Sequence, residues 1–315
     1  MKISVVMATY NGEKYIEEQL DSIRRQSLSP DEVLICDDGS QDNTGKIVSE
    51  YILRNGLSSS WHYIRNAVNK GVVLNFLDGA QNAIGDVIFY CDQDDIWDEK
   101  KLEMMKQGFL IYQDMLACYC LRDFVDANGD KINLRFDFMN NVKIRINGFQ
   151  KVSINEAVRY NKSPGLCLGI KKSLIQETRE MILDKRLTHD LPIGTVASIH
   201  NGYYVLNKKL VLYRQHESNV SSARYSVKSR LLNIEKQIQG RQLRLNQMKA
   251  ILNYYREDLS EVDLKHLEEA INITEESIIN LKEKNVLKLF LSIFNMNPMI
   301  NNWISVNNFL VSIRS

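Results

Sequence analysis

The sequence lacks three features that would place it in a specialised class. No apolar run approaches the roughly 18 residues of a membrane-spanning helix, and the run at residues 3–8 is too short for a signal peptide. The 40 Lys and Arg residues balance 39 Asp and Glu residues, and a net charge of +1 provides no general attraction for nucleic acid. These absences predict a globular cytoplasmic protein that does not bind nucleic acid.

The cysteines also lack the spacing of a zinc site. Zinc ligands come in closely spaced Cys or His pairs, and Cys118-x-Cys120 has no second pair. We interpret all five cysteines as reduced structural thiols, as expected in the cytosol; the others are Cys36, Cys91 and Cys167.

The first hundred residues alternate between strand and helix patterns. Repeated β-α-β units predict a mostly parallel sheet covered by helices on both faces, which is an α/β fold. Predicted strands cover residues 3–8, 32–36, 61–64 and 87–90, and the intervening helices end near Gln26, run through Tyr51 and span 73–83.

Polar residues follow three of these strands. Tyr10 follows the first, Asp38 follows the second, and Asp92-Gln93-Asp94-Asp95 follows the fourth. Right-handed crossovers bring such loops to one edge of the sheet, where ligands bind in open α/β sheets. Magnesium and manganese prefer oxygen ligands and leave room for substrate phosphates, so an Asp-x-Asp at this edge suits a nucleoside diphosphate. A solvated acidic loop is the alternative.

The middle of the chain mixes patterns. Residues 115–125 alternate like a strand, residues 191–199 are typical of a short helix, and residues 203–213 predict a hairpin around Asn207-Lys208.

From about residue 225, two apolar stripes with three- and four-residue spacing predict an antiparallel helix pair, separated by a capping box at Ser260-Glu261-Val262-Asp263. The stripes pack on each other or form a homodimer. We therefore divide the chain into an α/β domain over 1–224 and a helical region over 225–315. The apolar segment 286–294 either packs on the helices or lies in a membrane interface. The first stripe contains Leu231, Ile234, Ile238, Leu245, Met248, Leu252 and Tyr255, with Arg241 as a gap.

Several segments, in their order and spacing, resemble family 2 glycosyltransferases with the GT-A fold. Segments farther along resemble the bacterial rhamnosyltransferase-like branch of that family. The resemblance covers about residues 1–222. The family segments are 7–12, 33–42, Asn69-Lys70-Gly71 with Asn75, and 92–95; the branch segments are 163–165, 189–190 and 213–221.

The resemblance implies a donor site for a UDP- or dTDP-sugar. Ala8, Thr9 and Tyr10 match the loop that borders the nucleotide base. Asp38 matches the acid that contacts the pyrimidine ring, whose N3–H suits a carboxylate acceptor. Packing at the strand end is the alternative for Tyr10. Gly71 also matches the donor segment, as does Asn75.

The resemblance also implies a metal site for Mn²⁺ or Mg²⁺. Asp94 matches the metal ligand, Asp92 matches a ribose or metal contact, and Gln93 occupies the variable position between them. His216 either supplies a further metal ligand or is an ordinary hydrogen-bonded side chain. The loop 217–224 is a candidate lid.

On the acceptor side, Asp190 matches the catalytic base of the family. A carboxylate can take the proton of an acceptor hydroxyl as it attacks the anomeric carbon, and one base with direct displacement inverts that centre. A helix cap is the alternative role for Asp190. His189 is expected to shape the loop, and Trp97 either stacks on a sugar or anchors the core.

The expected function is therefore inverting transfer of a sugar, with rhamnose as the candidate, to a growing cell-surface polysaccharide or a lipid-linked glycan. A lipid-linked acceptor would bring the protein to the inner face of the plasma membrane. A non-catalytic nucleotide-sugar-binding scaffold is the alternative. A nucleotidyltransferase is disfavoured, because residues 9–14 do not form the Gly/Arg/Lys-rich loop that grips a triphosphate.

Overall fold

The computed structural model describes residues 1–132, 148–160, 165–216 and 234–283. These residues belong to two compact units, one formed by 1–153 with 162–215 and the other by 154–161 with 216–315. Four features of the sequence analysis lie outside the described residues: the predicted boundary at 224, the candidate lid 217–224, the segment 163–164 and the apolar tail 286–294.

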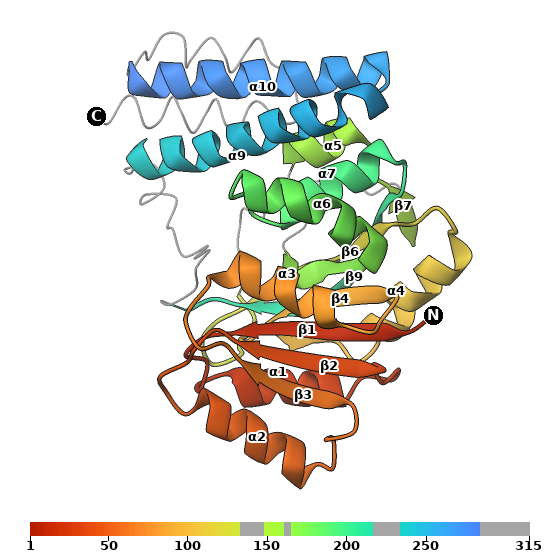
Figure 1. Cartoon of the computed structure of the whole chain (residues 1–315), viewed down its shortest axis with the longest axis vertical. Helices are drawn as coiled ribbons and strands as arrows, with labels where there is room; N and C mark the ends of the chain where they lie inside the picture. Colours follow the sequence, from red (N-terminus) through yellow and green to blue (C-terminus); the bar gives the residue numbers. More distant parts are fainter. Residues whose placement is uncertain (133–147, 161–164, 217–233, 284–315) are drawn as a thin grey trace. The chain divides into compact units, whose positions relative to one another are not determined.

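One mixed sheet forms the centre of the first unit (Figure 1). Its strand order is β3-β2-β1-β4-β8-β6-β9-β5, and β7 pairs with β9. The strands are β1 (Ile3–Thr9), β2 (Glu32–Asp37), β3 (Trp61–Arg65), β4 (Val87–Asp92), β5 (Ile96–Trp97), β6 (Ala117–Val125), β7 (Phe149–Lys151), β8 (Leu168–Lys171) and β9 (Tyr203–Arg214).

The four predicted parallel strands are confirmed. β1 pairs in parallel with β2 and β4, and β2 pairs in parallel with β3. Every residue of β1 is buried, which explains why residues 5–8 are a continuous apolar run rather than an alternating one. Helices cover the sheet: α1 (Ile16–Arg24), α2 (Thr44–Arg54), α3 (Val72–Asn82), α4 (Lys101–Ile111), α6 (Lys172–Asp184) and α7 (Asp190–Ile199).

The predicted hairpin at residues 203–213 is wrong. β9 is a single strand that pairs in parallel with β6, and the pairing slips between Cys120 and Arg122. Cys120 is opposite Leu206, whereas Leu121 is opposite Lys209, so the polar residues between them bulge out of the ladder. The turn-like dipeptide Asn207-Lys208 therefore forms a bulge, and β9 continues beyond it to Arg214.

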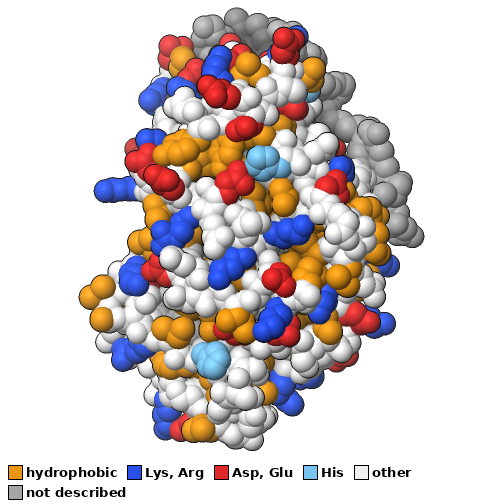
Figure 2. Space-filling model, turned by 45° about the vertical axis from the view of Figure 1, so that its right-hand side comes forward, with side chains coloured by type: hydrophobic (Ala, Val, Ile, Leu, Met, Phe, Trp, Pro, Cys, Tyr) orange, Lys and Arg blue, Asp and Glu red, His pale blue; other side chains and the backbone are white. Residues whose placement is uncertain are grey.

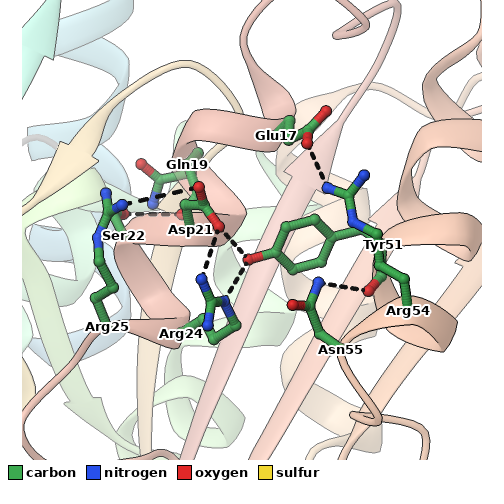
Figure 3. Close-up of polar contacts among 9 residues, drawn as sticks. All are labelled: Glu17, Gln19, Asp21, Ser22, Arg24, Arg25, Tyr51, Arg54 and Asn55. Carbon is green, nitrogen blue, oxygen red and sulfur yellow. Dashed lines mark hydrogen bonds and ion pairs between the residues drawn. The ribbon is translucent and has the colours of Figure 1, made fainter.

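Helix α1 is fixed to α2 by a polar cluster that Figure 3 shows in close-up. The Tyr51 hydroxyl donates to Asp21 Oδ1 (2.6 Å) and accepts from Arg24 Nε (3.0 Å). This hydrogen bond from Tyr51 is the main cause that lowers the pKa of Asp21. Burial, followed by the Asp21 contact, raises the pKa of Tyr51 to about 12.

Replacing Tyr51 with Phe is expected to destabilise the first unit by about 1–2 kcal/mol at pH 7, because the Asp21 carboxylate loses the shorter of its two hydrogen bonds, to Tyr51, and keeps the one from Arg24. The folded-state pKa of Asp21 is depressed, so its stabilising contribution is present above the unfolded pKa and is lost as pH falls. The difference between Tyr51→Phe and wild type should therefore shrink from about pH 5 towards pH 3. Urea unfolding across this range checks it, and a difference that does not depend on pH would contradict it.

The second unit contains α5 (Ile154–Tyr160) and the predicted helix pair, α9 (Ile234–Tyr255) and α10 (Glu261–Lys282). α9 and α10 pack side by side (Figure 1), so apolar residues of both stripes are used within one chain. The capping box is confirmed, because Ser260 Oγ accepts from the Asp263 N–H (3.1 Å). Ile251, rather than the predicted Leu252, is buried in α9.

Among the described residues, no helix has both the length and the apolar character needed to cross a membrane. On the face drawn in Figure 2, Lys and Arg side chains are interspersed with Asp and Glu, as on an ordinary solvated surface.

Candidate functional site

The sheet register brings the predicted donor residues to one edge. Ala8 is opposite Asp92 on β4, and Thr9 is opposite Asp37 on β2. The loops that follow β1, β2 and β4 therefore start next to one another, because the three strands are parallel and adjacent (Figure 1). The predicted gathering of Tyr10, Asp38 and the acidic loop (Asp92–Asp95) at the carboxyl edge is confirmed.

Gln93 joins the acidic loop to the loop after β1. Its Oε1 accepts from Thr9 Oγ1 (2.6 Å) and from the Tyr10 N–H (2.8 Å), and its Nε2 donates to the Tyr10 carbonyl (3.2 Å). The residue at the variable position of the Asp-x-Asp pattern thus connects two loops through three hydrogen bonds. Tyr10 itself is exposed, with 45% of its surface accessible, which leaves its ring available at the edge.

Gly12 leaves space for the Gln93 side chain in this arrangement. A Cβ at this position would lie 2.3 Å from Gln93 Oε1 and 3.0 Å from Thr9 Oγ1. Gly12→Ala should displace the Gln93 amide and loosen the loop after β1, which raises the KM for the donor roughly tenfold by misplacing a contact at the reacting site. Steady-state kinetics measure this effect. Gly56→Ala is unsuitable as a control because of its positive φ, whereas Gly240→Ala has open space and should leave the KM unchanged.

Asp38 is buried and holds the loop after β3. Its Oδ1 accepts from the Lys70 N–H (2.8 Å) and from Asn66 Nδ2 (3.0 Å), and its Oδ2 accepts from the Gly71 N–H (2.8 Å). Gly71 has a φ of 88°, which favours glycine, and it stands at the N-cap of α3. The carboxylate therefore orders this loop.

Asn75 is a support for the same loop. It is 3% exposed, donates through Nδ2 to the Cys36 carbonyl (2.6 Å) and accepts from Asn66 Nδ2 (3.0 Å). Asn66, which bridges Asp38 and Asn75, was not predicted; its place directly after a strand was the only available signal. Asp37 accepts from the Ser40 N–H (2.8 Å) and thereby braces the loop after β2.

The acidic loop carries more negative charge than its surroundings offset. Burial, followed by the Asp94 carboxylate, raises the pKa of Asp92, and the same causes raise the pKa of Asp95 well above its usual range. Asp95 Oδ1 accepts from the Arg214 N–H (3.2 Å), whereas Asp95 Oδ2 is buried with no hydrogen-bond partner in the described structure. Such a loop can accept a cation.

Two buried cations that were not predicted from the sequence lie near this loop. Lys101 is fully buried, donates through Nζ to the Leu166 carbonyl (2.8 Å) and lowers the pKa of Asp92 by its charge. Arg122, on β6, acts on Asp92 in the same direction, and its guanidinium lies 4.7 Å from the ring centroid of Tyr213. Both come from neighbouring parts of the fold that a local sequence pattern does not connect.

Trp97 is a core residue in the structure. Its side chain is 3% exposed, and the Lys101 ammonium lies 3.3 Å from the centroid of its ring. A sugar cannot stack on a buried ring face that a lysine covers, so of the two predicted roles the core anchor fits and the acceptor contact does not.

Asp190 is the first residue of α7, and it is close enough to Asp92 for its charge to raise the pKa of that carboxyl. Its Oδ1 accepts from Thr188 Oγ1 (2.8 Å) and from the Leu191 N–H (2.9 Å). The N-cap position belongs to His189, so Asp190 is not the helix cap. Within the described structure, its second oxygen accepts no hydrogen bond.

His189 is buried between the rings of Phe76 and Tyr90, at 5.1 Å from each centroid. Burial lowers its pKa, and neither ring nitrogen has a hydrogen-bond partner among the described residues. A Cβ on Gly165 would lie 2.4 Å from His189 Nε2. This packing agrees with the predicted role in shaping the loop that carries Asp190.

The predicted metal ligands are only partly placed. Asp92 and Asp94 lie in the first unit, whereas His216 is the first residue of the second unit that follows β9, so its part in the site stays a prediction. Within the described ranges, no group of three or more His, Cys, Asp or Glu side chains is arranged to hold a metal ion.

Comparisons with known proteins bear on the family and the fold. Residues 4–173 match the profile described as glycosyl transferase family 2. Over 239 residues, the chain is 31% identical to dTDP-rhamnosyl transferase RfbG of Shigella flexneri, which covers 71% of this chain and 76% of that protein. Other relatives match over shorter stretches; an uncharacterised glycosyltransferase of Nostoc, for example, is matched over 40% of its length.

Solved structures with the same fold include a protein in complex with UDP-GlcNAc and a mannosyltransferase. S. aureus TarS 1-349 in complex with UDP-GlcNAc aligns with 99% of this chain and 91% of that chain, at a TM-score of 0.57 and 18% identity. The mannosyltransferase PcManGT from Pyrobaculum calidifontis, in complex with GDP-Man and Mn²⁺, aligns with 99% of this chain and 86% of that chain, at a TM-score of 0.54 and 15% identity. The predicted GT-A fold, with a mixed α/β sheet and C-terminal helices, is confirmed.

Proposed function

Since this chain belongs to glycosyltransferase family 2, we propose that it transfers a sugar, with rhamnose as the candidate, from a UDP- or dTDP-sugar to a glycan hydroxyl with inversion. The observation that supports this most strongly is the convergence of Asp38, the acidic loop and Asp190 at one sheet edge. The named activity of the RfbG relative supports rhamnose and a thymidine donor.

The donor half of the proposal rests on the loops after β1 and β2. Tyr10 is exposed at the edge, and Asp38 is held there by three protein donors. A carboxylate oxygen has more than one lone pair, so Asp38 retains acceptor capacity for the N3–H of uracil or thymine. Thr9 and Gln93 act indirectly, because they hold the backbone of Tyr10 in place.

The acidic loop fits Mn²⁺ or Mg²⁺. The pKa values of Asp92 and Asp95 are raised, and Asp95 Oδ2 is buried without a partner in the described structure, so a divalent cation would relieve an existing excess of negative charge. Asp94 and Asp92 would hold the cation, and Asp95 would support the loop. A bound cation offsets the charge that gathers on the departing diphosphate.

Asp190 acts as the general base in this proposal. Thr188 and the Leu191 N–H fix one oxygen of its carboxylate, which leaves the other to accept the proton of the acceptor hydroxyl. The hydroxyl oxygen forms a bond to the anomeric carbon as the bond to the diphosphate breaks, and one displacement inverts the centre. His189 packs against Phe76 and Tyr90 and thereby positions the loop that carries Asp190. The acceptor in this proposal is a growing polysaccharide or a lipid-linked glycan.

Calorimetry on the full chain tests the donor claim. UDP or dTDP should bind in the presence of MnCl₂, and binding should weaken when EDTA removes the cation. GDP serves as the comparison, because its base presents a different edge to Asp38. Absence of any binding heat for both pyrimidine nucleotides, with Mn²⁺ and with Mg²⁺, would refute the proposal.

A further inference from the structure

Arg214, the last residue of β9, is buried to 1% exposure and fastens three parts of the sheet edge. Its backbone N–H donates to Asp95 Oδ1 (3.2 Å), and its Nε donates to the Asp94 carbonyl (3.0 Å). Its Nη1 donates to the Ala127 carbonyl in the turn after β6 (3.2 Å), and its guanidinium lies 4.9 Å from the ring centroid of Tyr15. The backbone of the acidic loop is therefore held directly by this side chain.

Glu18, on α1, supplies the counter-charge for this arginine. Arg214 Nη2 donates to Glu18 Oε2, and the two form an ion pair across 196 residues of sequence. The Arg214 side chain is 2% exposed, whereas the Glu18 side chain is 49% exposed. A buried guanidinium without a counter-charge would raise the free energy of the folded protein and would repel a divalent cation next to Asp94. Because Glu18 neutralises it, Arg214 can hold the acidic loop without repelling that cation.

We propose that Glu18 and Arg214 are a positioning pair that sets the cation affinity of the acidic loop without contacting the cation. The inference rests on the proposed function, because it takes Asp92 and Asp94 as the groups that hold Mn²⁺ or Mg²⁺. Partners outside the ligand set commonly alter metal affinity roughly 10- to 100-fold by orienting the ligands.

The neighbouring residue provides a matched control. Glu17 lies on the same helix and pairs with Arg54 on α2, as Figure 3 shows. The Glu17 and Arg54 side chains are 53% and 54% exposed, and such surface pairs contribute little. Glu17→Gln and Glu18→Gln therefore remove the same charge from adjacent positions, and only the second change removes a carboxylate that pairs with Arg214.

The test is a calorimetric titration of MnCl₂ into the full-length protein with UDP present. Enzyme kinetics at increasing Mn²⁺ concentration provide a second measurement. Glu18→Gln should weaken Mn²⁺ binding roughly 10- to 100-fold. The activity of this variant should recover at high Mn²⁺, while Glu17→Gln should resemble the wild type. Arg214→Lys retains the charge but not the fork of donors, so it should also weaken Mn²⁺ binding.

The outcomes separate this inference from the proposed function. If the wild type binds neither Mn²⁺ nor Mg²⁺, the metal part of the proposed function fails and the positioning pair falls with it. If the wild type binds Mn²⁺ and Glu18→Gln binds it as Glu17→Gln does, only the positioning pair is overturned. A purely structural role would lower the thermal midpoint of Glu18→Gln and leave its half-saturating Mn²⁺ concentration unchanged, which also overturns the inference.

Discussion

Asp190→Asn lowers kcat for sugar transfer by about 10²- to 10⁴-fold, the usual contribution of a positioned general base, while the affinity for UDP with Mn²⁺ stays close to that of the wild type. The reason is that the amide retains the contacts of Oδ1 with Thr188 and the Leu191 N–H but cannot take a proton. Kinetics and calorimetry on the same preparation measure the two effects separately.

Asp86→Asn is a suitable control for this change. Asp86 directly precedes β4, at the end opposite the acidic loop, and its side chain is 65% exposed. The same substitution there should leave kcat unaltered. Transfer by Asp190→Asn at the wild-type rate would remove Asp190 as the base, and a parallel loss of UDP binding would assign it to the donor site instead.

Asp94→Asn is expected to abolish measurable Mn²⁺ binding and to lower kcat/KM by at least about 100-fold, since it removes a proposed ligand rather than a residue behind one. Asp98→Asn provides the comparison, because Asp98 is the first acid after the acidic loop, is exposed, and uses Oδ1 to accept from the Lys100 N–H. Titration with Mn²⁺ distinguishes the two variants. Equal Mn²⁺ affinity in both would contradict the assignment of Asp94.

In the metal-free protein, Asp94→Asn is expected to raise the thermal stability, although it impairs Mn²⁺ binding and activity. The Asp94 carboxylate raises the pKa of Asp92 and Asp95, so removing its charge lowers both. A carboxyl whose folded-state pKa is raised makes the folded protein less stable as pH rises from the unfolded pKa to the folded one. In EDTA, Asp94→Asn should therefore have a higher thermal midpoint than wild type at neutral pH, and the gain should fade as the solution is acidified.

Much of the donor edge could be predicted from the sequence because it depends on local patterns. Continuous apolar runs indicated buried parallel strands, and parallel strands end at the same edge, so Tyr10, Asp38 and Asp92 had to meet. The same logic failed at β9, where Asn207-Lys208 has the composition of a turn but forms a bulge in a strand that continues to Arg214.

The supports of the site could not be predicted in this way. Arg214 meets Glu18 across 196 residues, and Lys101 reaches the Leu166 carbonyl, which is 65 residues away. No periodicity within one element records such contacts. Trp97 illustrates the same limit, because only the packing of Lys101 over its ring decides between its two predicted roles.

Release of nucleoside diphosphate from a panel of UDP-, dTDP- and GDP-sugars, with Mn²⁺ and with EDTA, tests the central claim most directly. We predict Mn²⁺-dependent release from at least one pyrimidine donor, with a dTDP-sugar as the first candidate, and loss of that release in Asp94→Asn. Turnover of a GDP-sugar alone, or turnover of any donor at an equal rate in EDTA, would contradict the account.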